Sequence, residues 1–138
     1  MFEKGTMKKK IKIKSELKNL RIVERVVDEL SAEMGIDSNN YGKIIVSTME
    51  AVNNAVIHGN KSDIKKEIEI KFNYEENKLK ITVEDEGNGF NYNNIPDPTL
   101  PENIEKITGR GVFLMRKLAD EVKFNKKGNR VTLIFNIK

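Results

Sequence analysis

The segment Asp85-Glu86-Gly87-Asn88-Gly89 combines a carboxylate with two glycines and directly follows a predicted strand. A carboxylate at a strand end is partly sheltered, so Asp85 can accept a hydrogen bond from an exocyclic amine such as that of adenine. Gly87 and Gly89 permit backbone conformations closed to other residues and let a ligand approach closely. A plain glycine-rich turn after a strand would have the same pattern, so this motif alone leaves both interpretations open.

A second glycine pair, Gly109 and Gly111, flanks Arg110 just before a predicted helix. The first turn of a helix offers unpaired N–H groups and the positive end of the helix dipole, which together favour phosphate. The guanidinium of Arg110 adds a fork that matches phosphate oxygens. The alternative interpretation is a glycine-rich hinge that leads into the helix.

Glu50 and Asn54 stand four residues apart within Thr48 to Asn60 (TMEAVNNAVIHGN). Residues at this spacing lie on one helical face, about one turn from each other. A neighbouring line of the same helix has the spacing of a buried stripe, and it consists of Ile45, Met49, Val52 and Val56. A solvated helix face would also carry such a polar pair, so alone it only suggests a site.

Other catalytic chemistries find little support. The chain has no cysteine and a single histidine, His58, which excludes disulfides, thiol nucleophiles and metal sites built from Cys or several His. At a helix end, His58 is explained by a favourable interaction with the helix dipole. A glycosidase-like carboxylate pair, Glu50 with Asp85, would leave the glycine pairs unexplained.

Hydrophobic periodicity predicts the elements that position these residues. Lys8 to Lys14 alternates like an edge strand, and Gly35 should end the helix that follows Ser15. The predicted fold is an α/β (α+β) two-layer sandwich, in which three helices cover one face of a mixed, mostly antiparallel sheet. In chain order we expect a strand at 8–14, helices at 17–34 and 41–58, strands at 67–74 and 79–83, a helix from 112, and strands at 122–125 and 130–138.

The stretch from about 91 to 107 loses all periodicity and contains the three prolines of the chain, Pro96, Pro98 and Pro101. Long aperiodic loops inside compact domains are uncommon and often act as lids over a site. We therefore predict a lid between the two glycine motifs.

Length and composition predict one domain over residues 1–138. A net charge of +4, spread over short lysine clusters, disfavours direct nucleic-acid binding and suits a small anionic ligand. We expect a cytoplasmic protein, because no apolar run has the length of a membrane span and no signal peptide follows the basic N-terminus.

Together, the three motifs and the lid resemble the nucleotide-binding domain of the GHKL ATPase superfamily. This Bergerat fold is shared by gyrase, the Hsp90 chaperones, histidine kinases and MutL. Two stretches, EAVNNAVIHGN and TGRGVFLMRKLADEV, are most similar to the bacterial anti-sigma-factor serine/threonine kinases. The resemblance covers nearly the whole chain.

The resemblance implies ATP and Mg²⁺ as cofactors and a role for each motif. Glu50 would be the general base and Asn54 the Mg²⁺ ligand. Asp85 would bond the adenine amine, with Thr132 supporting it directly or through water. The remaining expected contacts are Gly87 and Gly89 around the adenine, Gly109, Arg110 and Gly111 around the phosphates, and Asn53 and His58 in supporting positions beside the site.

The implied function is an anti-sigma kinase that phosphorylates an anti-anti-sigma protein of the STAS type and sequesters a sigma factor. Lid closure over the nucleotide would exclude water, and lid order would differ between ATP and ADP. An alternative is a nucleotide-gated binding module without kinase activity. A detached histidine-kinase catalytic domain is disfavoured, because no helix with a phosphoacceptor His is present and Ile57 stands where those kinases often carry Lys. A homodimer through the 8–14 edge strand is a further expectation.

Overall fold

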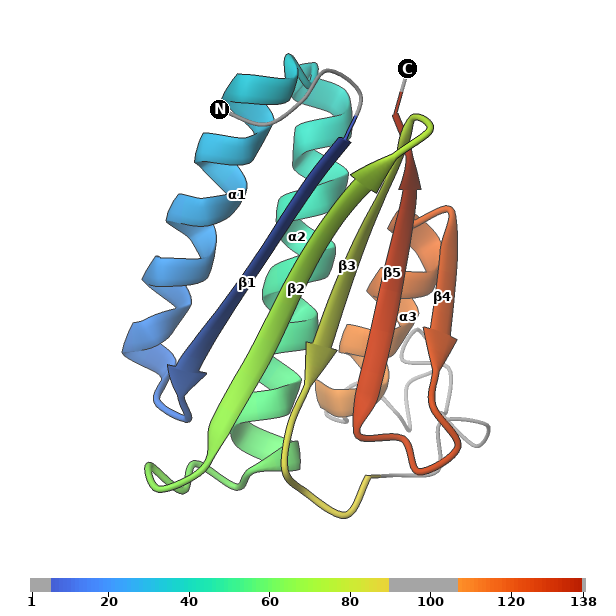
Figure 1. The fold of residues 1–138 in the computed structure, drawn as a ribbon. Coiled ribbons are helices and arrows are strands. Elements are labelled where there is room, and N and C mark those ends of the chain that lie inside the picture. Colours follow the sequence, from blue (N-terminus) through green and yellow to red (C-terminus); the bar gives the residue numbers. More distant parts are fainter. Residues whose placement is uncertain (1–5, 90–106, 138) are drawn as a thin grey trace.

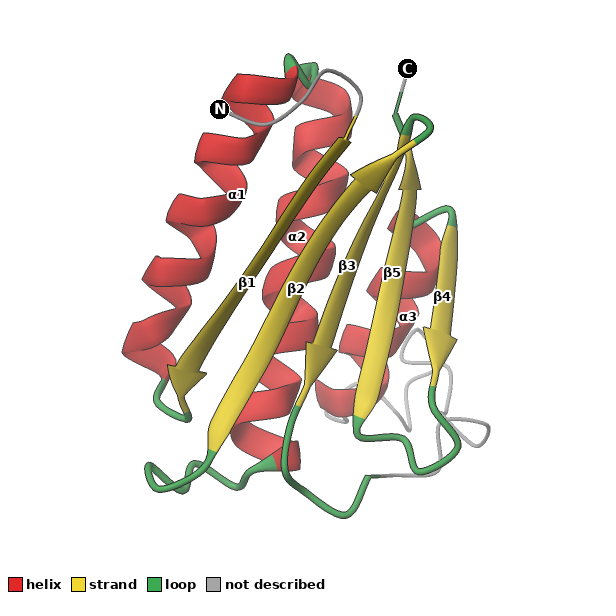
Figure 2. Ribbon diagram, in the orientation of Figure 1, coloured by secondary structure: helices red, strands yellow, loops and turns green. Residues whose placement is uncertain are grey.

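The computed structural model describes residues 6–89 and 107–137, with side chains described from Gly111 onward in the second range. Its described part forms two layers, an antiparallel sheet and three helices on one face of that sheet (Figures 1 and 2). The strand order is β1-β2-β3-β5-β4. The predicted two-layer α/β sandwich is confirmed, and all four strand pairings are antiparallel rather than mixed. The strands are β1 (Thr6–Lys14), β2 (Glu67–Glu75), β3 (Lys78–Glu84), β4 (Glu121–Phe124) and β5 (Arg130–Asn136), and the helices are α1 (Leu20–Met34), α2 (Ser38–Asn54) and α3 (Ile107–Leu118).

The sheet follows the alternation in the sequence. Ile68, Ile70 and Phe72 of β2 are buried against the helices, and the residues between them face the other side. Glu76 and Asn77 link β2 to β3 with φ values of 53° and 62°, the left-handed pair that a two-residue hairpin requires. As predicted, β1 lies at an edge of the sheet.

The helices begin and end close to the predicted positions. A 3₁₀ turn, Leu17–Asn19, precedes α1, and Gly35 ends α1 in the left-handed conformation with φ 66°. Asp37 caps α2, because its carboxylate accepts a hydrogen bond of 2.7 Å from the backbone N–H of Asn40. α2 therefore begins three residues before the expected Tyr41.

Two helix ends differ from the prediction in ways that affect the site. α2 gives way at Asn54 to one wide π-helical turn, Ala55–Gly59, instead of continuing as an α-helix to His58. α3 begins at Ile107, so Gly109 and Gly111 lie in its first turns and not before it. Helix propensity disfavours glycine inside a helix, which is why the sequence pattern alone placed the start of α3 later.

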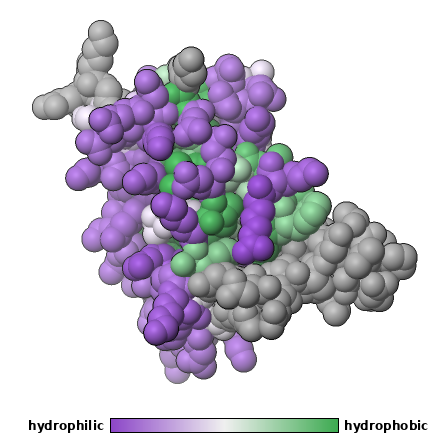
Figure 3. Space-filling view, turned by 90° about the vertical axis from the view of Figure 1, so that its right-hand side faces the viewer, coloured by the Kyte–Doolittle hydropathy of each residue, from purple (hydrophilic) through white to green (hydrophobic). Residues whose placement is uncertain are grey.

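Buried apolar residues from β2, β3 and β5 pack against the three helices to form one core. Figure 3 shows hydrophilic side chains over much of the side formed by β4 and α3, with a smaller apolar area among them. No helix in residues 6–89 or 107–137 is long and apolar enough to cross a membrane.

Candidate functional site

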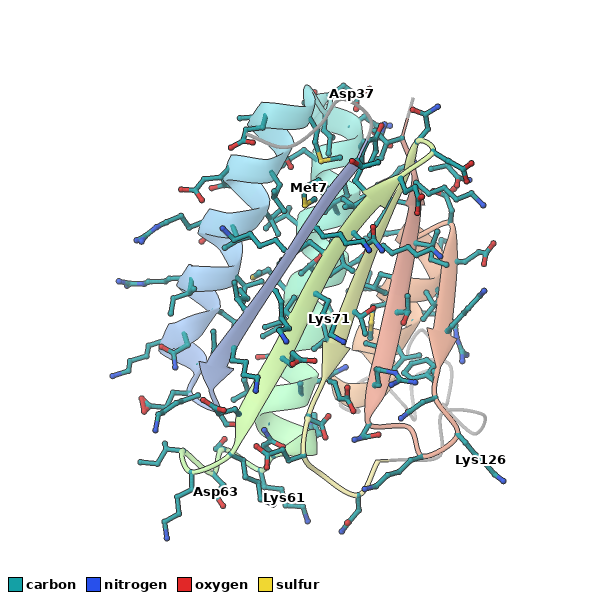
Figure 4. All side chains as sticks on the ribbon, viewed as in Figure 1. Met7, Asp37, Lys61, Asp63, Lys71 and Lys126 are labelled. Atoms are coloured by element: carbon teal, nitrogen blue, oxygen red, sulfur yellow. The ribbon has the colours of Figure 1, made fainter. Side chains whose placement is uncertain are left out.

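A pocket of about 280 Å³ opens at one end of the sheet, where α2 ends. The end of β3, the start of β5 and the turn between β4 and β5 meet at this same end (Figure 1). Lys61, after α2, and Lys126, in the β4–β5 turn, both lie at this end in Figure 4. The lining is mostly apolar with a few polar groups, as in many ligand sites. Its residues are Ala51, Asn54, Ala55, His58, Gly59, Val83, Asp85, Gly89, Val112, Met115, Phe124, Gly128, Asn129, Arg130 and Val131.

Asp85 follows β3 directly and is held by its own loop and by the start of β5. Its backbone N–H donates to the carbonyl of Asn129 at 3.0 Å, and the side-chain amide of Asn129 donates to the carbonyl of Asp85 at 2.9 Å. The backbone N–H of Gly87 donates to the Asp85 carboxylate at 2.7 Å. These bonds hold the carboxylate in the pocket wall before any ligand arrives.

Burial raises the pKa of the Asp85 carboxyl above its ordinary value of 3.8. The hydrogen bond from Gly87 lowers this pKa, and so do the charges of Lys127 and Lys66, while the charge of Glu84 raises it. Desolvation is the largest of these effects, so the net direction is upward. The predicted sheltering of this carboxylate is therefore present.

Close backbone contacts within the protein explain why residues 87 and 89, next to Asp85, are glycines. A Cβ on Gly87 would collide with the carbonyl oxygen of Gly59, and a Cβ on Gly89 would collide with that of Lys127. Gly89 also has a φ of 81°, which L side chains rarely adopt. Sequence reasoning assigned both glycines to close approach of a ligand, whereas the neighbours that approach most closely are backbone carbonyls from two other segments.

Glu50 and Asn54 are half-buried on α2 and face the start of α3. A Cβ on Gly111 would lie 2.8 Å from Nδ2 of Asn54 and 3.0 Å from Oε1 of Glu50. The α2 pair and the second glycine motif, more than fifty residues apart in the sequence, thus meet at one point. Both side-chain polar atoms of Asn54 are buried without a hydrogen-bond partner in the described structure. Buried polar atoms without partners are rare in folded proteins, and a bound ion or ligand would give the Asn54 amide the partners it lacks.

Part of the predicted site lies outside what is described. Gly109 and Arg110 are placed as backbone in the first turn of α3, and the side chain of Arg110 is not among those described. Of the predicted lid, residues 91–106 also lie outside. The roles predicted for Arg110 and for the lid therefore stay predictions.

Thr132 is not among the residues that line the pocket, and its role in supporting Asp85 stays a prediction. Its hydroxyl lies 3.4 Å from that of Thr82, its partner on β3. Side chains alternate along a strand, so Thr132 faces the opposite side of the sheet from Val131, which lines the pocket. Asn129 bonds to the backbone of Asp85.

The structure also adds residues that sequence reasoning did not assign to the site. The apolar walls come from five residues within the predicted strands and helices, namely Val83, Val112, Met115, Phe124 and Val131. The turn Lys127-Gly128-Asn129 lies between the predicted strands 122–125 and 130–138, but its contact with Asp85 depends on how β3 and β5 pair. Of the two predicted supporting residues, His58 is exposed and lines the pocket, whereas Asn53 is half-buried and is not among the lining residues.

An antiparallel sheet covered on one face by three helices, with a pocket between α2, α3 and the end of β3, is the GHKL or Bergerat fold. Residues 13–135 match the histidine kinase-like ATPase domain family, and the chain belongs to that family.

Two similar curated proteins share one name. Serine-protein kinase RsbW of Bacillus cereus is 30% identical to this chain over 128 residues, which cover 88% of this chain and 77% of the relative. Serine-protein kinase RsbW of Bacillus subtilis is 26% identical over 119 residues, covering 82% of this chain and 74% of the relative. A crystal structure of the RsbU and RsbW domains of a Mycobacterium tuberculosis protein matches with a TM-score of 0.70. That match has 20% identity and covers 95% of this chain and 32% of the other, so it supports the fold alone.

Proposed function

We propose that this protein is an ATP-dependent serine/threonine kinase and anti-sigma factor, which phosphorylates an anti-anti-sigma protein and sequesters a sigma factor. Membership of an ATPase domain family supports the use of ATP. The serine-protein kinase name shared by its relatives supports phosphoryl transfer to a hydroxyl.

The convergence of Glu50, Asn54 and Gly111 is the observation that carries this proposal. Phosphoryl transfer depends mainly on positioning and on stabilising charge at the transferred group. The arrangement brings a carboxylate, a buried amide and the first turns of a helix to one place, which is what a γ-phosphate and an attacking hydroxyl need. A protein that only bound nucleotide could do without the carboxylate of Glu50 at this point.

The other end of the pocket suits the base. Asp85 would accept a hydrogen bond from the exocyclic amine of adenine, while Val83, Val131 and Met115 would enclose the ring. The ring would then lie between apolar walls with one fixed acceptor. Guanine carries an oxygen where adenine carries this amine, so the Asp85 carboxylate would repel it.

At the phosphate end, the helical N–H groups around Gly109 and Gly111 would hold the phosphate oxygens. Glu50 would take the proton of the attacking serine or threonine hydroxyl. The hydroxyl oxygen then forms a bond to the γ-phosphorus as the bond from that phosphorus to the bridging oxygen breaks, and ADP leaves with that electron pair.

The residues present fit a magnesium ion brought by the nucleotide. In the described ranges, no group of three or more His, Cys, Asp or Glu side chains is placed to hold a metal. Magnesium commonly keeps several waters and takes few protein ligands beside substrate phosphates, and the buried amide oxygen of Asn54 suits it as a neutral oxygen ligand. When bound, the ion neutralises charge on the phosphates.

Association of two copies is part of the proposal. β1 lies at an edge of the sheet, and its far side has no strand partner among the described residues. An exposed edge can pair with a second chain, and the lysines at 8, 10, 12 and 14 would have to be accommodated there. Sedimentation at tens of micromolar would detect the dimer, and a monomer at that concentration would contradict this interface.

The function is tested by incubating the protein with Mg-ATP and a STAS-type anti-anti-sigma protein, followed by intact mass measurement. The proposal expects the STAS protein to gain the mass of one phosphoryl group. Glu50→Gln should abolish that gain while leaving ATP affinity within about threefold of the wild type, because the amide keeps the size of the carboxylate but cannot take a proton. ATP binding without phosphorylation in the wild type would instead identify a nucleotide-gated binding module.

A further inference from the structure

We infer that Asn60 is a positioning residue for base recognition: its buried side chain fixes the loop of residues 85–89 (the Asp85 loop) against the end of α2. This inference rests on the proposed binding of ATP. Asn60 follows the π-helical turn Ala55–Gly59 and is 1% exposed, although asparagine is seldom buried to this degree.

The side chain of Asn60 connects three segments that are distant in the sequence. Its Nδ2 donates to Oγ of Ser15 at 2.8 Å and to the carbonyl of Glu67 at 3.1 Å. Its Oδ1 accepts from the backbone N–H of Glu86 at 2.7 Å. The amide thus joins the end of β1, the start of β2 and the Asp85 loop.

The chain of hydrogen bonds continues beyond Asn60. Ser15 is fully buried, and its hydroxyl donates to the carbonyl of Lys66 at 2.8 Å. The backbone N–H of Asn60 donates to the carbonyl of Ala55 at 2.8 Å, which closes the π-helical turn. Since π-helical turns are rare and concentrate at functional sites, this turn is better explained by what it positions than by local sequence preference.

Only an amide meets these requirements. An aspartate at residue 60 could not donate to the Glu67 carbonyl, and an apolar side chain would remove both this donor and the acceptor of the Glu86 N–H in partly buried places. Neither the hairpin β2–β3 nor the helix α2 needs Asn60 for its own pattern of hydrogen bonds. The side chain of Asn60 instead links these elements to one another.

The Asp85 loop is held on its other side by Asn129, which bonds to the backbone of Asp85. Asn60 therefore fixes the loop relative to α2, and Asn129 fixes it relative to β5. Glu50 and Asn54 also lie on α2, so Asn60 sets the position of the adenine acceptor relative to the phosphate end. A nucleotide has a fixed span between base and phosphates, and a misplaced acceptor would weaken recognition of the base in particular.

The test compares Asn60→Ala with Val27→Ala, a core variant on α1 that is destabilising but does not line the pocket. Affinities for Mg-ATP and Mg-GTP are measured by calorimetry, and amide exchange of Glu86 is measured without nucleotide. We expect Asn60→Ala to lower ATP affinity by about tenfold and GTP affinity much less, and to speed Glu86 exchange by about tenfold or more. Val27→Ala should lower the melting temperature and leave both the ATP-to-GTP ratio and Glu86 exchange unchanged.

A second pair of variants covers the case in which Asn60→Ala does not fold. Ser15→Ala removes only one partner of the Asn60 amide, and Ser31→Ala removes a buried hydroxyl without a hydrogen-bond partner in the described structure. Ser15→Ala should lower the ATP-to-GTP ratio by about threefold, and Ser31→Ala should not change it.

The inference would be overturned if Asn60→Ala, or Ser15→Ala in the second pair, left ATP affinity unchanged or weakened ATP and GTP equally. Glu86 exchange at the wild-type rate in Asn60→Ala would overturn it as well. Failure of the wild type to bind ATP would instead contradict the proposed function, and the exchange rate of Glu86 would still report on the hydrogen bond from Asn60.

Discussion

The carboxylate of Asp85 packs directly against Gly59, so closely that a Cβ at residue 59 would overlap its atoms. Gly59 closes the π-helical turn after α2, and Asp85 follows β3, so the contact joins a helix end to a strand end. Space for the carboxylate exists only because residue 59 has no side chain.

Gly59→Ala should therefore disturb Asp85 directly. Overpacking of a filled site typically costs about 1–3 kcal/mol of unfolding free energy, and displacement of the carboxylate should lower ATP affinity by at least about tenfold. Denaturant unfolding and calorimetry with Mg-ATP would measure the two effects. The matched control is Gly42→Ala in α2, where a Cβ would meet nothing within 4 Å. That variant should be more stable by about 0.5–1 kcal/mol and bind ATP normally. Equal behaviour of the two variants would contradict the packing described for Gly59.

Asp85→Asn should separate stability from binding. The amide keeps the acceptor oxygen for the Gly87 N–H but removes a charge that burial disfavours. We expect a melting temperature at or above that of the wild type without nucleotide, and a loss of ATP affinity of about tenfold to a hundredfold. Thermal unfolding and calorimetry on the same samples test this. A variant that is clearly less stable yet binds ATP at full affinity would contradict the role given to Asp85.

The burial of the Asp85 carboxyl should also affect how the stability of the protein depends on pH. Because burial raises the pKa of Asp85 above 3.8 in the folded state, the folded protein binds this proton more tightly than the unfolded chain. The contribution of Asp85 to the unfolding free energy is then most favourable below pH 3.8 and declines as pH rises through the folded pKa. The stability of the wild type relative to Asp85→Asn should fall over that window. A relative stability that rises with pH would mean that the pKa is lowered, contrary to the effect of burial.

Gly111→Ala tests the meeting of α2 and α3. The added Cβ would lie 2.8 Å from Nδ2 of Asn54, closer than real Cβ contacts come, and 3.0 Å from Oε1 of Glu50, which is tighter than most of them. We expect phosphoryl transfer to fall by about a hundredfold or more, since small displacements of catalytic groups can cost that much, with a smaller loss of ATP affinity. Rates from single-turnover transfer to the STAS-type substrate and affinities from calorimetry would separate the two. Wild-type transfer in this variant would show that Glu50 and Asn54 do not act together at this point.

The features that could be predicted from sequence are those encoded locally. Alternation in Glu67–Tyr74 and the four-residue spacing of Glu50 and Asn54 fix strand and helix faces, because side-chain direction has a period of 2.0 or 3.6. Asp85, at the end of a strand pattern, was assigned on the same basis. The short gap between the predicted strands 67–74 and 79–83 leaves room only for a tight turn, which the structure places at Glu76 and Asn77.

What could not be predicted depends on contacts between distant segments. The role of Thr132 came from the family resemblance alone. Thr132 lies near the start of β5, and side chains one residue apart on a strand, such as those of Val131 and Thr132, face opposite sides of the sheet. Gly59 directly follows the predicted helix 41–58, and its contact with Asp85 arises only when β3 and the end of α2 are brought together. The start of α3 was placed too late because two glycines lowered the local helix signal there.

The most direct test of the account is the melting temperature of the protein with and without Mg-ATP. Binding at roughly a hundredfold excess over Kd should stabilise the folded state by about 2.7 kcal/mol and raise the melting temperature accordingly. Mg-GTP at the same concentration should raise it less, and Asp85→Asn should lose most of the response to ATP. A wild-type protein whose melting temperature does not change at saturating Mg-ATP would contradict the assignment of this pocket to ATP.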